Sequence, residues 1–163
     1  MKKLLLILLL LCHVSEASDM KLIGEGTLTV LFFKVYDVRL LADSKPFSWE
    51  NKFQLEFEYR RTIKKENVIE STIKELHLQP TISEKDIDAW RTHLSQSIEP
   101  VQEGTRAEVA WNPKGQITFH YEGSQPTVVL DEKFARAFLN IWLGENSSQP
   151  KLRDQLLGEQ GKD

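Results

Sequence analysis

The stretch FQLEFEYRR, residues 53–61, decides the fold class. From Phe53 to Tyr59, apolar side chains alternate with polar ones, which is typical of a β-strand with one face buried and the other in water. If the alternation continues, Arg61 points to the apolar side beside Tyr59. The stretch therefore predicts a sheet that buries one face and needs a second layer to cover it.

Further strands and helices are expected on both sides of this stretch. Runs of β-branched and aromatic residues predict strands over residues 27–33, 35–41, 106–111, 116–121 and 127–130. Apolar residues at helical spacing predict helices over residues 66–76, from the N-cap candidate Ser83 to Ile98, over 132–143, and from Pro150 to Gly158. This order predicts an α+β fold with an antiparallel sheet covered on one face by helices. A parallel sheet would require strands that alternate with helices along the sequence, and the predicted elements do not alternate in this way.

The N-terminus predicts export. Lys2 and Lys3 precede an unbroken apolar run over residues 4–11, and Ser15 and Ala17 place small residues at positions −3 and −1 of a cleavage site. Residues 1–17 are therefore expected to be a cleavable signal peptide, and residues 18–163 a single domain. The apolar run is shorter than the roughly 20 residues that span a bilayer, and no later segment is long enough, so no transmembrane segment is expected. A buried N-terminal helix is the alternative.

Cys12 is the only cysteine of the chain. Acylation at Cys12, as in a lipoprotein, is a further alternative, but Leu11 stands where such processing normally has a small residue. Cleavage after Ala17 would remove the thiol. The mature chain would then have no disulfide, no thiolate catalyst and no cysteine metal site.

Composition argues against several classes of function. The formal net charge is −3 and the charges are mixed along the chain. The sequence contains no basic stripe that would bind nucleic acid and no polybasic segment that would bind an anionic membrane surface. No phosphate-binding glycine loop, nucleophile elbow or metalloprotease helix is present. Neither a metal site nor acid–base catalysis is expected from the remaining candidates, which are His77, His93 and His120 on separate elements and the solvated pairs Glu56/Glu58 and Asp86/Asp88.

Arg61 is the main candidate functional residue. A guanidinium on the apolar side of a sheet needs a partner, because burying an unpaired charge is unfavourable. Three interpretations stay open: a salt bridge with Glu70 or Glu75, a ligand anchor at the mouth of an apolar pocket beside Tyr59, or a strand register that differs from the one assumed here.

Several short motifs together resemble the chalcone isomerase-like domain, most closely its small exported bacterial branch. The resemblance covers residues 21–158, and the order and spacing of the motifs carry it. They are Gly24/Gly26, VYDVRL at 35–40, Tyr59/Arg61/Ile63, FARAF at 134–138, IWLG at 141–144, and Pro150, Leu152, Arg153 and residues 156–158.

The resemblance implies an open-faced β-sandwich, in which a large antiparallel sheet carries a layer of helices. Relatives in this family either cyclise chalcones or bind fatty acids in the cleft between sheet and helices. In the plant enzymes an arginine just after the G-x-G region polarises the substrate, and Leu28 occupies that position here. Because an apolar side chain cannot supply that charge, the resemblance favours a non-catalytic periplasmic protein without a cofactor.

The candidate ligand contacts are Arg61, Tyr59, Tyr36 and Arg39. The expected ligand is a small apolar or acidic amphipathic molecule such as a fatty acid. Two alternatives stay open: an isomerase or lyase that acts on a phenolic or enone substrate through Arg61, Tyr59 or Tyr36, and a protein-interaction module.

Overall fold

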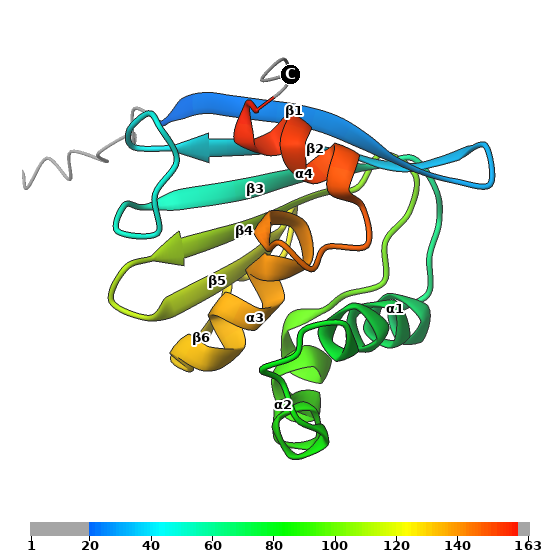
Figure 1. The fold of residues 1–163 in the computed structure, drawn as a ribbon. Helices are drawn as coiled ribbons and strands as arrows, with labels where there is room; N and C mark the ends of the chain where they lie inside the picture. Colours follow the sequence, from blue (N-terminus) through cyan, green and yellow to red (C-terminus); the bar gives the residue numbers. More distant parts are fainter. Residues whose placement is uncertain (1–19, 160–163) are drawn as a thin grey trace, which may run out of the picture.

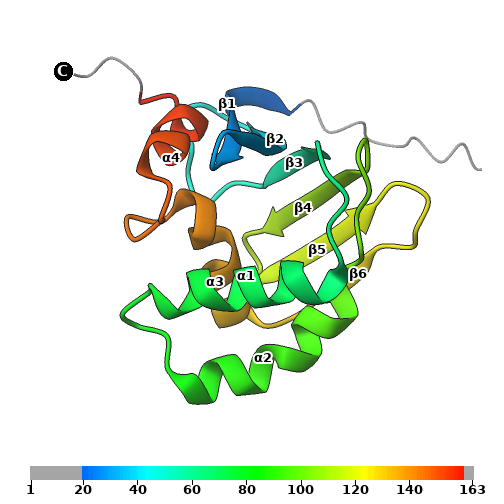
Figure 2. The same ribbon diagram turned by 90° about the vertical axis from the view of Figure 1, so that its right-hand side faces the viewer.

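The computed structural model describes residues 20–159, so the predicted signal peptide and Cys12 lie outside the described residues. Six strands form one antiparallel sheet in sequence order, and four helices cover one of its faces (Figures 1 and 2). The α+β open-faced sandwich expected from the sequence is confirmed. Within residues 20–159, none of the helices combines the length and apolar character needed to cross a bilayer. The strands are β1 (Lys21–Val30), β2 (Phe33–Ala42), β3 (Phe53–Tyr59), β4 (Arg106–Asn112), β5 (Gln116–Tyr121) and β6 (Thr127–Val129), and the helices are α1 (Lys65–His77), α2 (Glu84–Ser97), α3 (Glu132–Leu143) and α4 (Pro150–Leu157).

Alternating burial along β3 fixes which face of the sheet the helices cover. Phe53 and Leu55 are fully buried, whereas Glu56 on the other face is only half-buried. Helix α3 packs against the buried face, and the rings of Phe119 on β5 and Phe138 on α3 meet edge to face at 4.9 Å. Each large apolar side chain buried in this way stabilises the fold by about 1.5–3 kcal/mol relative to exposure.

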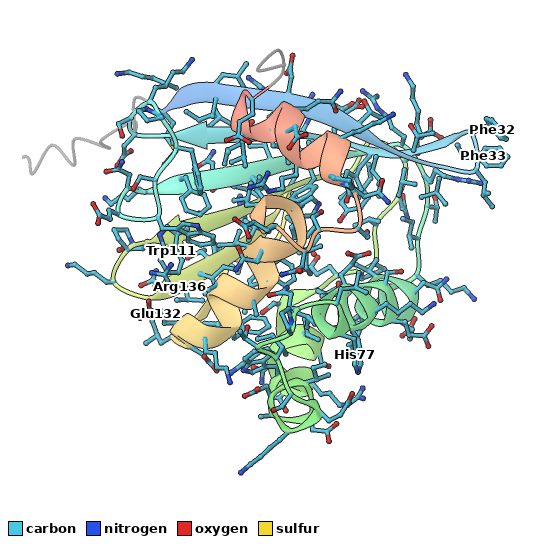
Figure 3. The ribbon with its side chains drawn as sticks, viewed as in Figure 1. Phe32, Phe33, His77, Trp111, Glu132 and Arg136 are labelled. Atoms are coloured by element: carbon cyan, nitrogen blue, oxygen red, sulfur yellow. The ribbon has the colours of Figure 1, made fainter. Side chains whose placement is uncertain are left out.

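One end of the sandwich is filled by an aromatic cluster of Phe47, Trp49, Phe53 and Trp111, with ring centroids 4.9–6.1 Å apart. The indole Nε1 of Trp111 donates a hydrogen bond to the carbonyl oxygen of Trp49 at 2.9 Å. The Arg136 guanidinium covers both indoles, with its carbon 5.1 Å from the ring centroid of Trp49 and 5.0 Å from that of Trp111. Figure 3 shows Arg136 near Trp111. This end is therefore closed by side chains.

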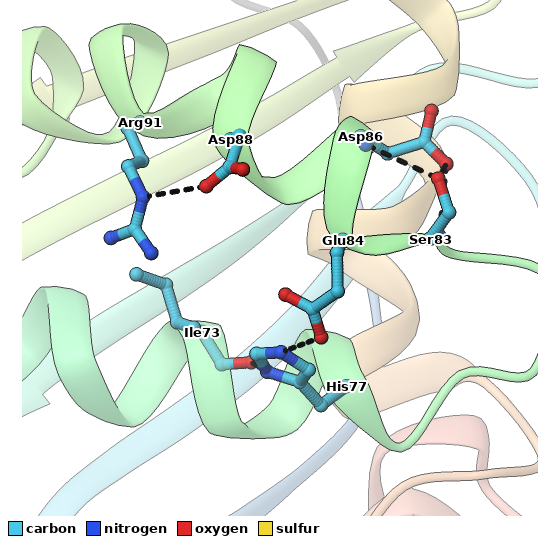
Figure 4. A network of polar contacts seen from close by, with 7 residues as sticks. All are labelled: Ile73, His77, Ser83, Glu84, Asp86, Asp88 and Arg91. Atoms are coloured by element: carbon cyan, nitrogen blue, oxygen red, sulfur yellow. Dashed lines mark hydrogen bonds and ion pairs between the residues drawn. The ribbon is translucent and has the colours of Figure 1, made fainter.

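Polar contacts fix the helices to one another, as Figure 4 shows at the start of α2. Ser83, the predicted N-cap residue, forms a capping box with Asp86. His77 at the end of α1 contacts Glu84 at 2.7 Å between Nε2 and Oε1. The Lys133 ammonium of α3 lies 2.7 Å from Asp86 Oδ1 and, together with Ser83, holds the pKa of that carboxyl well below its usual range. Helix α2 is thus tied to both α1 and α3.

Helix α4 packs directly on the edge strand β1 at the two glycines of the G-x-G motif. A Cβ at Gly24 would overlap the carbonyl oxygen of Gln155 and lie 2.5 Å from that of Leu156. A Cβ at Gly26 would meet only side-chain atoms, those of Gln155 and Leu152. The motif therefore allows the backbones of a strand and a helix to approach closely.

The first hairpin differs from the expectation. A strand over residues 27–33 was expected, but β1 ends at Val30 and β2 begins at Phe33, which pairs with Val30. The expected boundary was wrong because a two-residue turn occupies Leu31 and Phe32, whose φ angles are +47° and +71°. Left-handed backbone costs about 1–2 kcal/mol per residue for side chains of this kind, so the sequence gives no local signal for this turn.

We expect Gly24→Ala to lower the free energy of unfolding by about 3 kcal/mol, because the added methyl group meets helix backbone that cannot rotate away. Gly26→Ala is the matched control and should lose about 1 kcal/mol, since the side chains it meets can move. Urea unfolding of both variants measures the difference. Equal losses would contradict the assignment of the backbone contact to Gly24.

Candidate functional site

A cavity of about 620 Å³ lies between the helix-covered face of the sheet and the helices, at the end of β3 opposite the aromatic cluster. Strands β1 to β5 and helices α1, α3 and α4 all contribute to its wall. The sheet side is formed by residues such as Phe57, Val109 and Phe119, and the helix side by residues such as Val68 and Phe138. The sandwich is therefore filled at one end and hollow at the other.

Aromatic rings in mutual contact form much of the cavity wall. The Phe57 ring lies 5.3 Å from Tyr36 and 5.2 Å from Trp142, and Trp142 lies 5.5 Å from Phe138, measured between ring centroids. Such rings bury large areas and interact edge to face. This aromatic part of the wall is held in place by its own packing.

Three tyrosines, Tyr36, Tyr59 and Tyr121, bring hydroxyl groups to the sheet side of the wall. The Tyr36 hydroxyl accepts a hydrogen bond from the indole Nε1 of Trp142 at 2.8 Å. For the Tyr59 hydroxyl, the structure records no hydrogen bond within residues 20–159. Burial raises the pKa of all three phenols above the usual range. All three therefore stay protonated at neutral pH, where they can donate a proton in a hydrogen bond but cannot act as bases.

Arg61 lies at the mouth of the cavity rather than on the buried face. The expectation from strand alternation was wrong, because β3 ends at Tyr59 and the chain then leaves the sheet. Arg61 is exposed, and its guanidinium carbon stands 4.7 Å from the centroid of the Phe33 ring. Within the described residues it forms no ion pair, so the expected alternative of a salt bridge with Glu70 or Glu75 is also wrong.

The other cation in the cavity wall is Arg153 of α4, and it is already engaged. Its Nε donates to the carbonyl oxygen of Leu143 at 3.2 Å, and its Nη1 lies 3.3 Å from Asp154 and 3.6 Å from Glu159. Glu75 on α1, the acidic residue of the wall, accepts a hydrogen bond from Ser148 at 2.7 Å. Among the lining residues that the structure describes, Arg61 is thus the cation that carries no ion pair.

Arg39 does not join the other candidate contacts. It lies on the face of the sheet that the helices leave open, where it pairs with Glu25 at 3.6 Å and Glu56 at 3.5 Å. Tyr36, Tyr59 and Arg61 do come together at the cavity. Within residues 20–159, no three His, Cys, Asp or Glu side chains are grouped as a metal site requires.

Leu28 faces the same cavity. It pairs with Tyr36 across β1 and β2, and Tyr36 pairs with Tyr59 across β2 and β3. The three residues form one row across the sheet, and all of them line the cavity. The position that the resemblance aligns with a substrate-polarising arginine is therefore part of the cavity wall, and it is apolar.

The family model described as chalcone isomerase-like matches residues 12–158. The chain belongs to this family. An uncharacterised protein of Haemophilus influenzae is 25% identical over 164 residues, which cover 98% of this chain and 78% of that protein. The crystal structure of a fatty-acid binding protein of Arabidopsis thaliana has a TM-score of 0.62 and 12% sequence identity, and the match covers 86% of this chain and 87% of that chain. At this identity the likeness shows a shared chalcone isomerase-like fold.

The sequence predicts the helix that carries Phe138 and Trp142, but it does not identify these two residues as cavity wall. Helical periodicity identifies the side of a helix that faces the sheet, but it does not tell whether side chains fill the space between. The consecutive apolar residues Val30, Leu31, Phe32 and Phe33 were a signal that went unused. A strand with one buried face cannot bury four residues in a row.

We expect Arg61→Ala to change the free energy of unfolding by about 1 kcal/mol or less, because only an exposed cation–π contact is lost. Phe57→Ala, a truncation in the buried wall, should lower it by about 3–5 kcal/mol. Urea denaturation of the ligand-free proteins measures both. A loss of several kcal/mol in Arg61→Ala would instead indicate a buried charge partner.

Proposed function

We propose that this chalcone isomerase-like protein is a non-catalytic periplasmic binding protein that holds an apolar or amphipathic ligand, such as a fatty acid, in the cavity. The observation that carries the proposal is the shape and polarity of the cavity. Its volume of about 620 Å³ lies within the roughly 300–1,000 Å³ typical of small-molecule sites. The interior is aromatic and aliphatic, and an unpaired cation stands at the mouth.

This arrangement suits an acidic amphipathic molecule. The apolar tail would replace water along Phe57, Phe119 and Phe138, which is favourable for each buried methylene group. The carboxylate would stay at the wet mouth beside Arg61, where it need not lose all of its hydration. The Arabidopsis protein that shares the fold is named as a fatty-acid binding protein, and this supports the same class of ligand here.

The alternative is an isomerase or lyase that acts on a phenolic or enone substrate. Leu28 supplies no charge at the position of the isomerase arginine, and the raised pKa values of Tyr36 and Tyr59 keep both phenols protonated at neutral pH. These features favour binding over catalysis. Reproducible acceleration of chalcone cyclisation that Arg61→Ala abolishes would favour the enzyme.

We expect the purified protein to bind decanoate more tightly than decanol, because only the acid can contact Arg61. Arg61→Gln should remove about 1 kcal/mol of this contact at an exposed site, which is about a fivefold rise in Kd for decanoate and little change for decanol. Isothermal titration calorimetry in the absence of lipid measures all four affinities.

A cavity-filling variant separates specific binding from adsorption. Ala107 lines the cavity and is almost fully buried, so Ala107→Phe places a ring in the volume proposed for the tail. It should weaken binding of both probes, and a melting curve of the ligand-free variant confirms that it folds. The proposal fails if wild type binds neither probe, or if the ring changes neither affinity.

Location is a separate part of the proposal and is tested on the exported form. If residues 1–17 are a signal peptide, the mature protein begins at Ser18 and is released with the periplasmic fraction without added lipid. Intact mass and N-terminal sequencing establish this. A chain that begins at Cys12 with the mass of acyl groups would contradict it.

A further inference from the structure

The turn between β1 and β2 exposes a group of large apolar side chains, here called the apolar tip: Val30, Leu31, Phe32 and Phe33. They are 48%, 79%, 100% and 59% exposed. The hairpin projects past the other strands on the right of Figure 1, and Figure 3 shows Phe32 and Phe33 at its end. Isolated apolar residues on a surface are ordinary, but a contiguous group of this kind marks an interaction site.

Local folding does not account for these residues. Two-residue turns with positive φ at both central positions favour Asn-Gly or Asp-Gly, whereas this turn carries Leu31 and Phe32 at φ values of +47° and +71°. Asparagine and glycine would form the same turn with less strain and no exposed apolar surface. Two unfavourable choices at one place indicate that the side chains serve a role outside the domain.

The charged residue that follows the apolar tip in the sequence and the one that packs against it are both cations. No acidic residue occurs between Leu28 and Val35. Lys34 follows the tip and is exposed, and Arg61 lies against the Phe33 ring. Within residues 20–159 the structure records no ion pair for either. The tip is therefore an apolar point with positive charge at its base, although the chain has no polybasic segment.

We propose that the apolar tip inserts into the interfacial region of a lipid bilayer that contains anionic lipids. Leu31 and Phe32 would enter the boundary between headgroups and acyl chains, where aromatic and aliphatic side chains are stabilised. Lys34 and Arg61 would remain at the level of the anionic headgroups. This function goes beyond binding in the cavity and does not require it.

The position of the apolar tip favours a membrane over a protein partner. Val30, Leu31 and Phe33 also line the cavity, so insertion would bring the mouth of the cavity to the lipid surface. Stable protein–protein interfaces use about 20–30 residues on each side, and four side chains at the end of one hairpin offer far less. Interfacial binding requires only a few inserted apolar groups and a matching charge.

The decisive variant is the double substitution Leu31→Asn with Phe32→Gly, which installs the favoured turn sequence. The hairpin should keep or gain stability in urea unfolding, so loss of binding cannot be blamed on unfolding. Co-sedimentation uses vesicles of phosphatidylethanolamine and phosphatidylglycerol at 3:1, free of fatty acid, and vesicles of phosphatidylcholine. We expect the wild-type protein to bind the anionic vesicles more strongly than the phosphatidylcholine vesicles. The partition coefficient of the double variant on the anionic vesicles should be lower by a factor of about ten or more.

A matched control removes two exposed apolar side chains elsewhere. Val128 and Leu130 are 50% and 80% exposed, and Val128→Thr with Leu130→Asn should leave vesicle binding unchanged. All variants are prepared with the same N-terminus, so any contribution of the N-terminal residues to lipid binding is equal in all of them. Failure of wild type to bind either vesicle, or undiminished binding by the Leu31→Asn/Phe32→Gly variant, would overturn the proposal. So would a self-association in sedimentation velocity that this variant abolishes while vesicle binding persists.

Discussion

The burial of one face of a six-stranded antiparallel sheet governs the rest of the structure. Alternation along β3 puts aromatic and aliphatic side chains on one face, and such a face is stable only when a second layer covers it. Helix α3 covers the central strands, while α4 reaches the edge strand β1 because Gly24 lets the two backbones meet. The contact between His77 and Glu84 ties α1 to α2, and the contact between Lys133 and Asp86 ties α2 to α3.

The same covering layer produces the cavity. Where Trp49, Phe53 and Trp111 interlock, large rings fill the space between sheet and helices. At the other end of β3, Phe57, Phe138 and Trp142 line a volume that they do not fill. Native interiors are normally close-packed, so a hollow of about 620 Å³ kept open by packed aromatic rings is a feature that a ligand-binding function explains.

The sequence predicts the fold well because its decisive signals are local. The period of two in β3, the N-cap at Ser83 and the apolar stripe of α3 each depend on a few neighbouring residues, and the structure confirms all three. The site is harder to predict, because it depends on where regular structure stops. Arg61 continues the alternation in the sequence, but the chain has already left the sheet, so its parity carries no information about its direction. Arg39 is a different case: it lies three residues after Tyr36 in the same strand, so alternation along β2 itself places it on the opposite face.

The hairpin between β1 and β2 is a second feature that the sequence does not predict. Leu31 and Phe32 break the local rule for a two-residue turn, and read as sequence they only lengthen an apolar strand. Local rules describe which residues stabilise a turn, and a residue whose side chain serves a role outside the domain can depart from these rules. The Phe33 ring lies at the cavity mouth on the apolar tip and also supports the Arg61 guanidinium. One short segment thus joins the exposed tip to the charged entrance of the cavity. If the tip contacts lipid, as proposed, a ligand would enter the cavity from the lipid surface instead of from water.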